Sequence, residues 1–337
     1  MAESMLSEAH APHTIYLKDY QAPLFFIDDI ELKVDLYDDH ALVTSQLLMR
    51  RNRHGKDAHA DLFLQGESLE LQSITLEGKP LPQAAYTVSE QGLTVKGLPD
   101  TFQLQIVCKT YPHQNTALSG LYCSRGTFCT QCEAQGFRRI TYYLDQPDVL
   151  ARFVTTITAD KKNYPTLLSN GNLIDSGELP NGRHFATWQD PFKKPSYLFA
   201  LVAGDFDLLQ GDFKTQSGRM IDLRVYVEKG YGDQAGHALY SLQEAMRWDE
   251  LAYGREYDLG VYMIVAVPDF NMGAMENKGL NIFNSKYVLA DQRTATDMDY
   301  QNIQAIIAHE YFHNWTGNRI TCRDWFQLSL KEGLTVF

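Results

Sequence analysis

Short runs in which apolar and polar residues alternate recur between about residues 25 and 204 of this chain. In one of them Ile30, Leu32, Val34 and Leu36 are separated by charged residues. Side chains on a strand point alternately to two faces, so this pattern predicts a strand with one buried face. Comparable runs lie at residues 41–48, 69–76, 86–95, 102–107, 153–159 and 185–188. Turn-forming residues separate the runs, which predicts an all-β domain of antiparallel sheets, sandwich-like or saddle-like, over residues 1–205.

The pattern changes near residue 205. Apolar residues are spaced as in strands at residues 221–227 and 261–267, and as in helices at residues 235–253 and 297–316. Thr296 and Asp299 resemble a capping box before the second helical segment, and Gly317 with Asn318 supplies a stop. We therefore predict that residues 206–337 form a second, α+β domain.

Composition narrows the possible partners and the compartment. The chain has 337 residues with 30 Lys and Arg against 42 Asp and Glu, a formal charge of −12. This charge argues against binding to nucleic acid or to an anionic membrane. No apolar run approaches the roughly 20 residues of a membrane helix, and the first 20 residues lack a signal-peptide core. Five cysteines are too few for a disulfide scaffold, so we expect a soluble cytoplasmic protein. Oligomeric state cannot be read from the sequence, and a monomer is the default expectation.

The end of the chain is unusual for a domain. Residues 334–337 form an apolar stretch without a polar tail. Domains rarely end in this way, so we expect the sequence to be the front portion of a longer protein, with the second domain incomplete.

The second helical segment contains the pentapeptide His309-Glu310-Tyr311-Phe312-His313, an H-E-x-x-H motif. Residues four apart on a helix differ by about 40° in direction and about 6 Å in height, so both imidazoles can reach one ion. Glu310 then lies beside that ion, where its carboxylate can take a proton from a water molecule. The alternative is a pair of surface histidines on an amphipathic helix.

A catalytic zinc site usually has three protein ligands. Glu332 is a candidate for the third, because it follows His313 after 18 intervening residues, where a new helix begins. Ser329 and Glu332 could instead form a capping box, which would make the carboxylate structural. The preceding H-E-x-x-H motif favours the ligand.

Residues 271–279, Asn-Met-Gly-Ala-Met-Glu-Asn-Lys-Gly, lie between two strand-like runs. Gly273 and Gly279 allow close approach to the backbone, and an edge strand can hold an extended peptide by strand addition. Glu276 adds a negative charge. On spacing alone, a glycine-flanked hairpin turn with a solvated glutamate is the better explanation of the segment.

These motifs together resemble the zinc-dependent aminopeptidase N family of the gluzincin group. The resemblance rests on H-E-x-x-H followed by Glu332, on the Gly-Ala-Met-Glu-Asn run at residues 273–277, and on residues 128–153, which include Thr-Gln-Cys-Glu at residues 130–133. Details at residues 314–318 and 325–333 are similar to the bacterial cytosolic branch. The family implies a β domain followed by a thermolysin-like zinc peptidase domain.

The resemblance implies a role for each matching residue. His309, His313 and Glu332 would bind one Zn²⁺, and Glu310 would be the general base. Glu276 with Glu133 would bind the free α-ammonium group of a peptide substrate. The remaining implied substrate contacts are Gln131, Met272, Gly273, Ala274, Met275 and Asn277. Gln131 and Met272 would line the pocket for the first side chain, and the run from Gly273 to Asn277 would hold the peptide backbone.

Two hypotheses follow for the function. The first is a zinc aminopeptidase that releases N-terminal amino acids, because carboxylates that bind an ammonium near the metal admit little beyond one residue. The second is a non-catalytic fragment that binds zinc or peptide N-termini without turnover. In the family, a tyrosine downstream of the third ligand helps to stabilise the oxyanion, and this sequence ends before that position. Cys129 and Cys132 form a C-x-x-C pair without a second pair, which favours a structural role.

Overall fold

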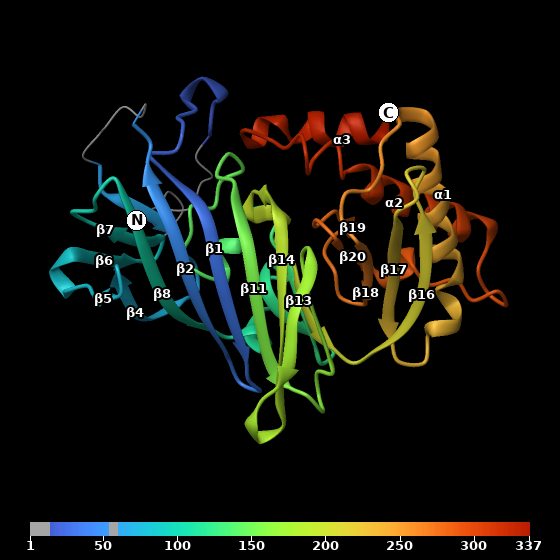
Figure 1. Ribbon diagram of the computed structural model, residues 1–337, viewed down its shortest axis with the longest axis horizontal. Coiled ribbons are helices and arrows are strands. Elements are labelled where there is room, and N and C mark those ends of the chain that lie inside the picture. Colours follow the sequence, from blue (N-terminus) through green and yellow to red (C-terminus); the bar gives the residue numbers. More distant parts are fainter. Residues whose placement is uncertain (1–13, 54–59) are drawn as a thin grey trace, which may run out of the picture.

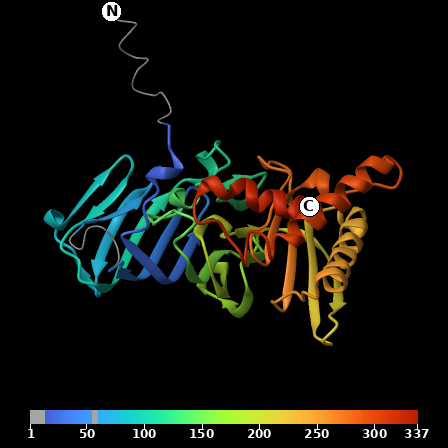
Figure 2. The ribbon, with the colours of Figure 1, turned by 90° about the horizontal axis from the view of Figure 1, so that it is seen from above.

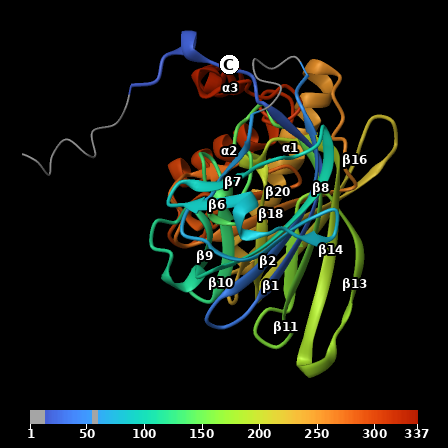
Figure 3. The same cartoon turned by 90° about the vertical axis from the view of Figure 1, so that its left-hand side faces the viewer.

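The computed structural model describes residues 14–53 and 60–337, and within them the strands form four sheets. The largest sheet has eight strands and lies on the left of Figure 1. Its strands, in spatial order, are β13 (Asn172–Glu178), β14 (Arg183–Lys194), β11 (Ala151–Asp160), β1 (Phe25–Leu36), β2 (Ala41–Arg51), β8 (Thr101–Thr110), β4 (Glu70–Leu76) and β5 (Lys79–Pro80). All neighbours are antiparallel except β1 and β11. The long strands β11, β13 and β14 reach below the rest of the molecule (Figures 1 and 3).

Two smaller sheets complete the β-rich part. One has the order β12 (Thr166–Ser169), β15 (Leu201–Gly204), β10 (Thr127–Gln131) and β9 (Gly120–Ser124). The other has the order β3 (Leu62–Gln65), β7 (Gly92–Val95) and β6 (Tyr86–Ser89). The strands of both sheets pair antiparallel, so almost all pairing in the part before residue 205 is antiparallel.

The remainder of the chain forms a mixed sheet with helices. The sheet has the order β16 (Phe206–Lys214), β17 (Met220–Glu228), β18 (Val261–Val267), β20 (Leu280–Asn284) and β19 (Ala274–Met275). The α-helices of the described chain are α1 (Gly236–Tyr253), α2 (Asp297–Phe312) and α3 (Leu328–Val336). Both α1 and α2 lie beside this sheet, and α3 crosses above its junction with the β-rich part (Figures 1 and 2). None of the described helices is long and apolar enough to cross a membrane.

Strand β18 separates two hydrophobic cores. Met263 and Val265 on one face belong to the core shared by the β-rich part. Tyr262 and Ile264 on the other face belong to the core formed with α1 and α2. All seven residues of β18 are buried, which explains why its sequence is continuously apolar instead of alternating.

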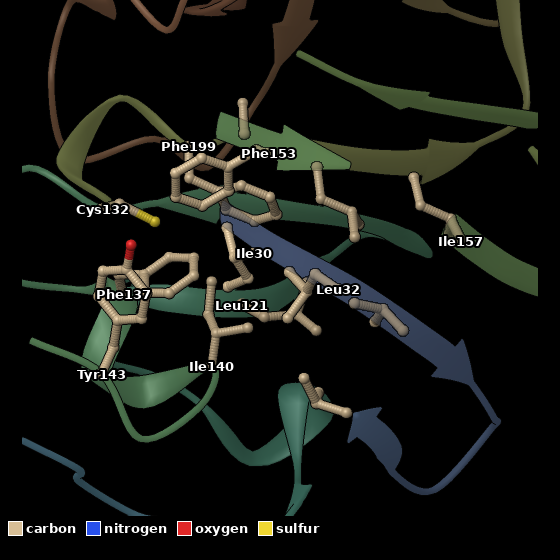
Figure 4. Close-up of a cluster of buried hydrophobic side chains, with 14 of the residues drawn as sticks. Ile30, Leu32, Leu121, Cys132, Phe137, Ile140, Tyr143, Phe153, Ile157 and Phe199 are labelled. Carbon is tan, nitrogen blue, oxygen red and sulfur yellow. The ribbon is translucent and has the colours of Figure 1, made fainter. Parts of the chain in front are cut away.

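Phe137, Tyr143, Phe153 and Phe199 pack among aliphatic side chains in the first core (Figure 4). Phe137 lies edge-to-face against Tyr143, Phe153 and Phe199, with ring centroids 4.8, 5.9 and 5.1 Å apart. Such pairs stabilise a core beyond their area burial. They fix the segment that leads from β10 to β11, which also carries Glu133.

The predicted capping box begins α2 as expected. Thr296 Oγ1 accepts from Asp299 N, and Thr296 N donates to Asp299 Oδ2. The helix ends at Phe312, four residues before the predicted end at residue 316. Beyond it the backbone turns through bonds from Asn318 N to His313 O and from Arg319 N to Asn314 O. The turn places the last histidine of the motif at the helix end.

The predicted fold class is confirmed, with differences in detail. Residues 86–95 form two strands of a hairpin instead of one strand. The strands β9, β10, β12 and β15 were missed because nearly all their residues are buried, which removes the alternation of a half-exposed strand. Ser329 lies inside α3 and does not cap it, so the alternative role of Glu332 in a capping box is wrong.

Asp249 is a buried carboxyl group whose ionisation should affect the stability of the protein. It is fully buried on α1, and its Oδ2 accepts from Trp315 Nε1 at 2.7 Å. Burial raises the pKa of Asp249 to about 6, although the bond from Trp315 opposes this. A raised carboxyl pKa favours the neutral form in the folded state, so this group becomes destabilising as pH rises from 4 to 7.

We expect Asp249→Asn, which keeps an acceptor for Trp315, to gain stability relative to the native protein as pH rises. The gain should reach about 2–3 kcal/mol at pH 7.5, because each unit of pKa shift corresponds to about 1.4 kcal/mol. Urea unfolding at pH 4.5 and 7.5 measures it. A difference that is independent of pH would contradict the prediction.

Candidate active site

A cavity of about 880 Å³ lies where α2, α3 and the edge strand β19 meet. Most of the predicted site residues line it: Glu133, Met272, Gly273, Ala274, Glu276, His309, Glu310, His313 and Glu332. Gln131, Met275 and Asn277 are buried and do not line it. Gln131 instead donates to Glu133 O at 3.0 Å, so it supports a residue of the cavity wall.

The three predicted metal ligands form a compact triangle of atoms. His309 Nε2 lies 3.0 Å from His313 Nε2 and 3.2 Å from Glu332 Oε2, and the third side measures 3.4 Å. Two ligands of a tetrahedral zinc ion, each bound at about 2.0–2.1 Å, are separated by about 3.4 Å. The donor set and its spacing therefore fit a single Zn²⁺.

His313 is oriented by the turn that follows it. Its Nδ1 donates to Thr316 O at 2.8 Å, which directs Nε2 toward the triangle. Burial opposes a charged imidazole here, but the charge of Glu276 and the bond with Glu332 outweigh it and raise the pKa of His313 to about 9. The carboxylates that favour this proton would equally favour a cation in the same place.

Glu310 has the environment of a proton acceptor. Its side chain is buried, and Oε2 has no hydrogen-bond partner among the described residues. Burial and the charge of Glu276 raise its pKa well above the ordinary value, although His313 opposes them. A carboxylate with a raised proton affinity at a cavity wall can accept a proton from a water molecule.

An ammonium group occupies a carboxylate cluster beside the triangle. Lys331 Nζ contacts Glu276 Oε1, lies 2.7 Å from Glu133 Oε1 and lies 3.0 Å from Glu332 Oε1. Lys331 is 4% exposed. Burial, together with the charge of Glu276, raises the pKa of Glu133 to about 7, although Lys331 opposes this. Glu332 thus faces the histidines with Oε2 and an ammonium with Oε1.

The segment before Glu276 forms a sheet edge at the cavity. Ala274 and Met275 pair with β20, and β19 is the last strand of its sheet. A Cβ atom on Gly273 would lie 3.2 Å from the Tyr287 ring, which leaves little room for a side chain. Glu276 is 3% exposed, so the alternative of a solvated glutamate in a hairpin turn is wrong.

Sequence reasoning missed two buried lysines of this site. Lys331 had no recognisable motif of its own. Lys278 lies in the segment of residues 271–279, is 3% exposed, pairs with Asp258 and donates to Asn314 Oδ1 at 3.2 Å. The available signal was Lys278 itself, a lysine two residues after Glu276 in a short segment between two apolar strands, because a buried charge needs partners.

The fold and the site together define a class of protein. A β-rich part precedes an α+β part whose H-E-x-x-H helix lies beside a free sheet edge, and this combination is typical of a metallopeptidase. The chain belongs to peptidase family M1: residues 29–198 match the peptidase M1 N-terminal domain, and residues 237–337 match the peptidase family M1 domain.

Comparison with individual relatives identifies the members of the peptidase family that this chain resembles. The chain is 58% identical over 326 residues to Aminopeptidase N of Escherichia coli (strain K12), and 57% identical over 326 residues to Aminopeptidase N of Caulobacter vibrioides (strain ATCC 19089 / CIP 103742 / CB 15). Each match covers 97% of this chain and 37% of the relative. A solved structure of Legionella pneumophila aminopeptidase A in complex with aspartic acid matches with a TM-score of 0.91 and 38% identity, covering 95% of this chain and 38% of that one. The predicted resemblance to aminopeptidase N is confirmed, and the chain spans a little over a third of these relatives.

The Lys331 cluster generates a stability prediction. Lys331→Met leaves Glu133 and Glu276 buried without a counter-charge, and removing one partner of a buried ion pair costs about 3–5 kcal/mol. We expect about 3 kcal/mol of lost unfolding free energy at pH 7.5, measured by denaturant. Adding Glu133→Gln to Lys331→Met should restore part of the lost unfolding free energy.

The control is Lys229→Met, because Lys229 is an exposed lysine that pairs with Asp205 and should change stability little. If the double variant Lys331→Met with Glu133→Gln is no more stable than Lys331→Met alone, the loss arises from packing, and the electrostatic explanation is wrong.

Proposed function

We propose that this chain carries the zinc site and the amino-terminus pocket of an aminopeptidase, which releases N-terminal amino acids from peptides. The observation that carries the proposal is the shared carboxylate of Glu332. One oxygen closes the triangle with His309 and His313, and the other lies 3.0 Å from an ammonium nitrogen. A metal site and an ammonium site separated by one carboxylate suit cleavage after the first residue of a peptide.

The proposed cofactor is one Zn²⁺ per chain, held by His309, His313 and Glu332. Two imidazoles and a carboxylate are an established ligand set for catalytic zinc, and a fourth position stays open. When bound, the ion would polarise the scissile carbonyl and make water a stronger nucleophile.

Glu310 is the proposed general base and acid. Its raised pKa suits it to take the proton of the attacking water and to carry it to the leaving amine nitrogen. Because Oε2 has no hydrogen-bond partner among the described residues, this oxygen is free to accept that proton.

Glu276 and Glu133 are the proposed ligands of the substrate α-ammonium group. With Lys331 between them, the three side chains carry a formal charge of −1, so the cluster still favours one more cation. The pairing of these carboxylates with the Lys331 ammonium supports this role. A peptide whose amine is blocked would lose this attraction.

The remaining contacts are assigned to the edge segment and its neighbours. Residues 273–277 would hold the substrate backbone by strand addition, starting at the free edge of β19. Met272 is 49% exposed at the cavity and would contact the first side chain. Gln131 would act on the same pocket through its bond to Glu133 O.

The domain and cellular assignments are also proposals. We place the β domain at residues 1–205 and the catalytic domain at residues 206–337, since β16 begins at Phe206. All five cysteines are free thiols, which suits a reducing cytoplasm and a role in peptide catabolism. The buried thiols include Cys129, whose pKa burial raises to about 12, so the C-x-x-C pair suits a structural role. We expect a monomer that binds peptides with a free N-terminus.

The proposal is tested by metal removal. The metal-loaded protein should cleave aminoacyl anilides, lose at least 100-fold in kcat/KM after chelation, and recover when zinc returns. The N-acetylated anilide should be a poor substrate throughout. Metal binding without any turnover, in this chain and in a full-length protein, would instead support a non-catalytic module.

Two substitutions separate the roles of the carboxylates. Glu310→Gln should lower kcat by about 10³-fold or more while zinc content stays at one per chain, because the residue is the proton acceptor and not a ligand. Glu332→Ala should lose zinc, because one corner of the triangle is removed. Metal analysis and steady-state kinetics measure both. Zinc loss in Glu310→Gln with full retention in Glu332→Ala would reverse the assignment.

A further inference from the structure

Four consecutive backbone carbonyls near the cavity accept hydrogen bonds from asparagine side chains. They belong to residues 275–278, which we name the clamped segment. The donors, in the order of the carbonyls, are Asn277 at 3.5 Å, Asn318 at 3.0 Å, Asn281 at 3.1 Å and Asn170 at 2.9 Å. Glu276 is part of this segment, so its position depends on these amides.

Residues 276–278 of the clamped segment lie outside the sheet. Pairing of β19 with β20 includes only Ala274 and Met275. After that the chain turns at Gly279, whose φ of +75° favours glycine and whose added Cβ would lie 2.9 Å from Leu259. Asn277 O also accepts from Leu280 N at 3.0 Å, whereas Glu276 O and Lys278 O, which lie outside the strands, accept from the asparagine amides.

Two of the four donors, Asn170 and Asn318, come from distant parts of the chain. Asn170 lies in the turn between β12 and β13, and its Oδ1 accepts from Ala200 N while Nδ2 donates to Lys278 O. Asn318 lies in the turn after α2. The clamped segment is thus held from the β-rich part on one side and from the H-E-x-x-H helix on the other.

Asn318 is hydrogen-bonded to the backbone of a residue from each of the two proposed subsites. Its N–H donates to His313 O at 2.9 Å, and its side chain donates to Glu276 O at 3.0 Å. Asn318 is 8% exposed, so water does not replace these bonds easily. Glu276 Oε1 lies 3.9 Å from His313 Nδ1, a spacing that this link maintains.

We propose that Asn318 is a positioning residue that fixes the carboxylate of Glu276 relative to His313, with Asn170 supporting the same segment from the β-rich part. The side chain of Asn318 does not line the cavity and acts only through Glu276. The inference rests on the proposed aminopeptidase function and deepens it, because this distance sets how far the substrate ammonium lies from the metal.

Asn318→Asp tests the inference in the zinc-loaded protein. The change is isosteric, but it replaces the donor with an oxygen that faces Glu276 O. We expect KM for an aminoacyl anilide and the inhibition constant of butylamine both to rise about tenfold, the equivalent of one buried hydrogen bond. We expect kcat to fall less than threefold and zinc content to stay at one per chain.

Asn52→Asp is the matched control, because Asn52 is a buried asparagine whose Nδ2 donates to Pro23 O at 2.8 Å in the β-rich part. It should leave KM and the butylamine constant unchanged. Asn318→Ala, which adds no repulsive oxygen, is the second variant and should shift both constants in the same direction by at least threefold. Asn170→Asp should do the same.

The outcomes separate the two levels of inference. If the native protein cleaves anilides but both constants stay unchanged in folded Asn318 variants, the positioning role is wrong. The positioning role is also wrong if Asn52→Asp raises both constants as much as Asn318→Asp does. If every Asn318 variant unfolds while Asn170→Asp leaves the constants unchanged, Asn318 is only structural. If the native, zinc-loaded protein cleaves no substrate, the proposed function itself fails.

Discussion

The ammonium group of Lys331 holds together the parts from which the site is built. It lies on α3 and contacts Glu276 of the clamped segment, Glu133 of the β-rich part and Glu332 of its own helix. A buried charge of this kind is tolerated only when its partners are arranged around it. The carboxylates at the junction of the two parts therefore take their positions from one cation, and the cavity between them keeps its shape.

The parts of the site that local geometry determines were predictable from the sequence. The spacing of His309 and His313 on a helix is enough to bring two imidazoles together, and the capping box at Thr296 marks where that helix begins. The alternating runs predicted the half-exposed strands of the β-rich part, because neighbouring side chains on a strand point to opposite faces. In each case residues close in sequence set the pattern.

The remaining features depend on contacts between distant residues. By its own spacing Glu332 could equally have been a cap, and only the H-E-x-x-H motif, which ends 18 intervening residues earlier, favoured a ligand. The contacts of Lys331 and Asn318 with Glu276 could not be predicted from local sequence, because Glu276 lies 55 and 42 residues away from them in the chain. Strands buried on both faces escaped detection because burial on both sides erases the alternation.

Strand β18 has a consequence for how the molecule loses its structure. Its two faces contribute to different hydrophobic cores, so neither core can open without exposing apolar residues of the other. Local opening of a protein follows cooperative units, and a shared central strand joins two such units into one. The β-rich part and the α+β part should therefore exchange the amide hydrogens of their central strands together, as a single unit despite their separate folds.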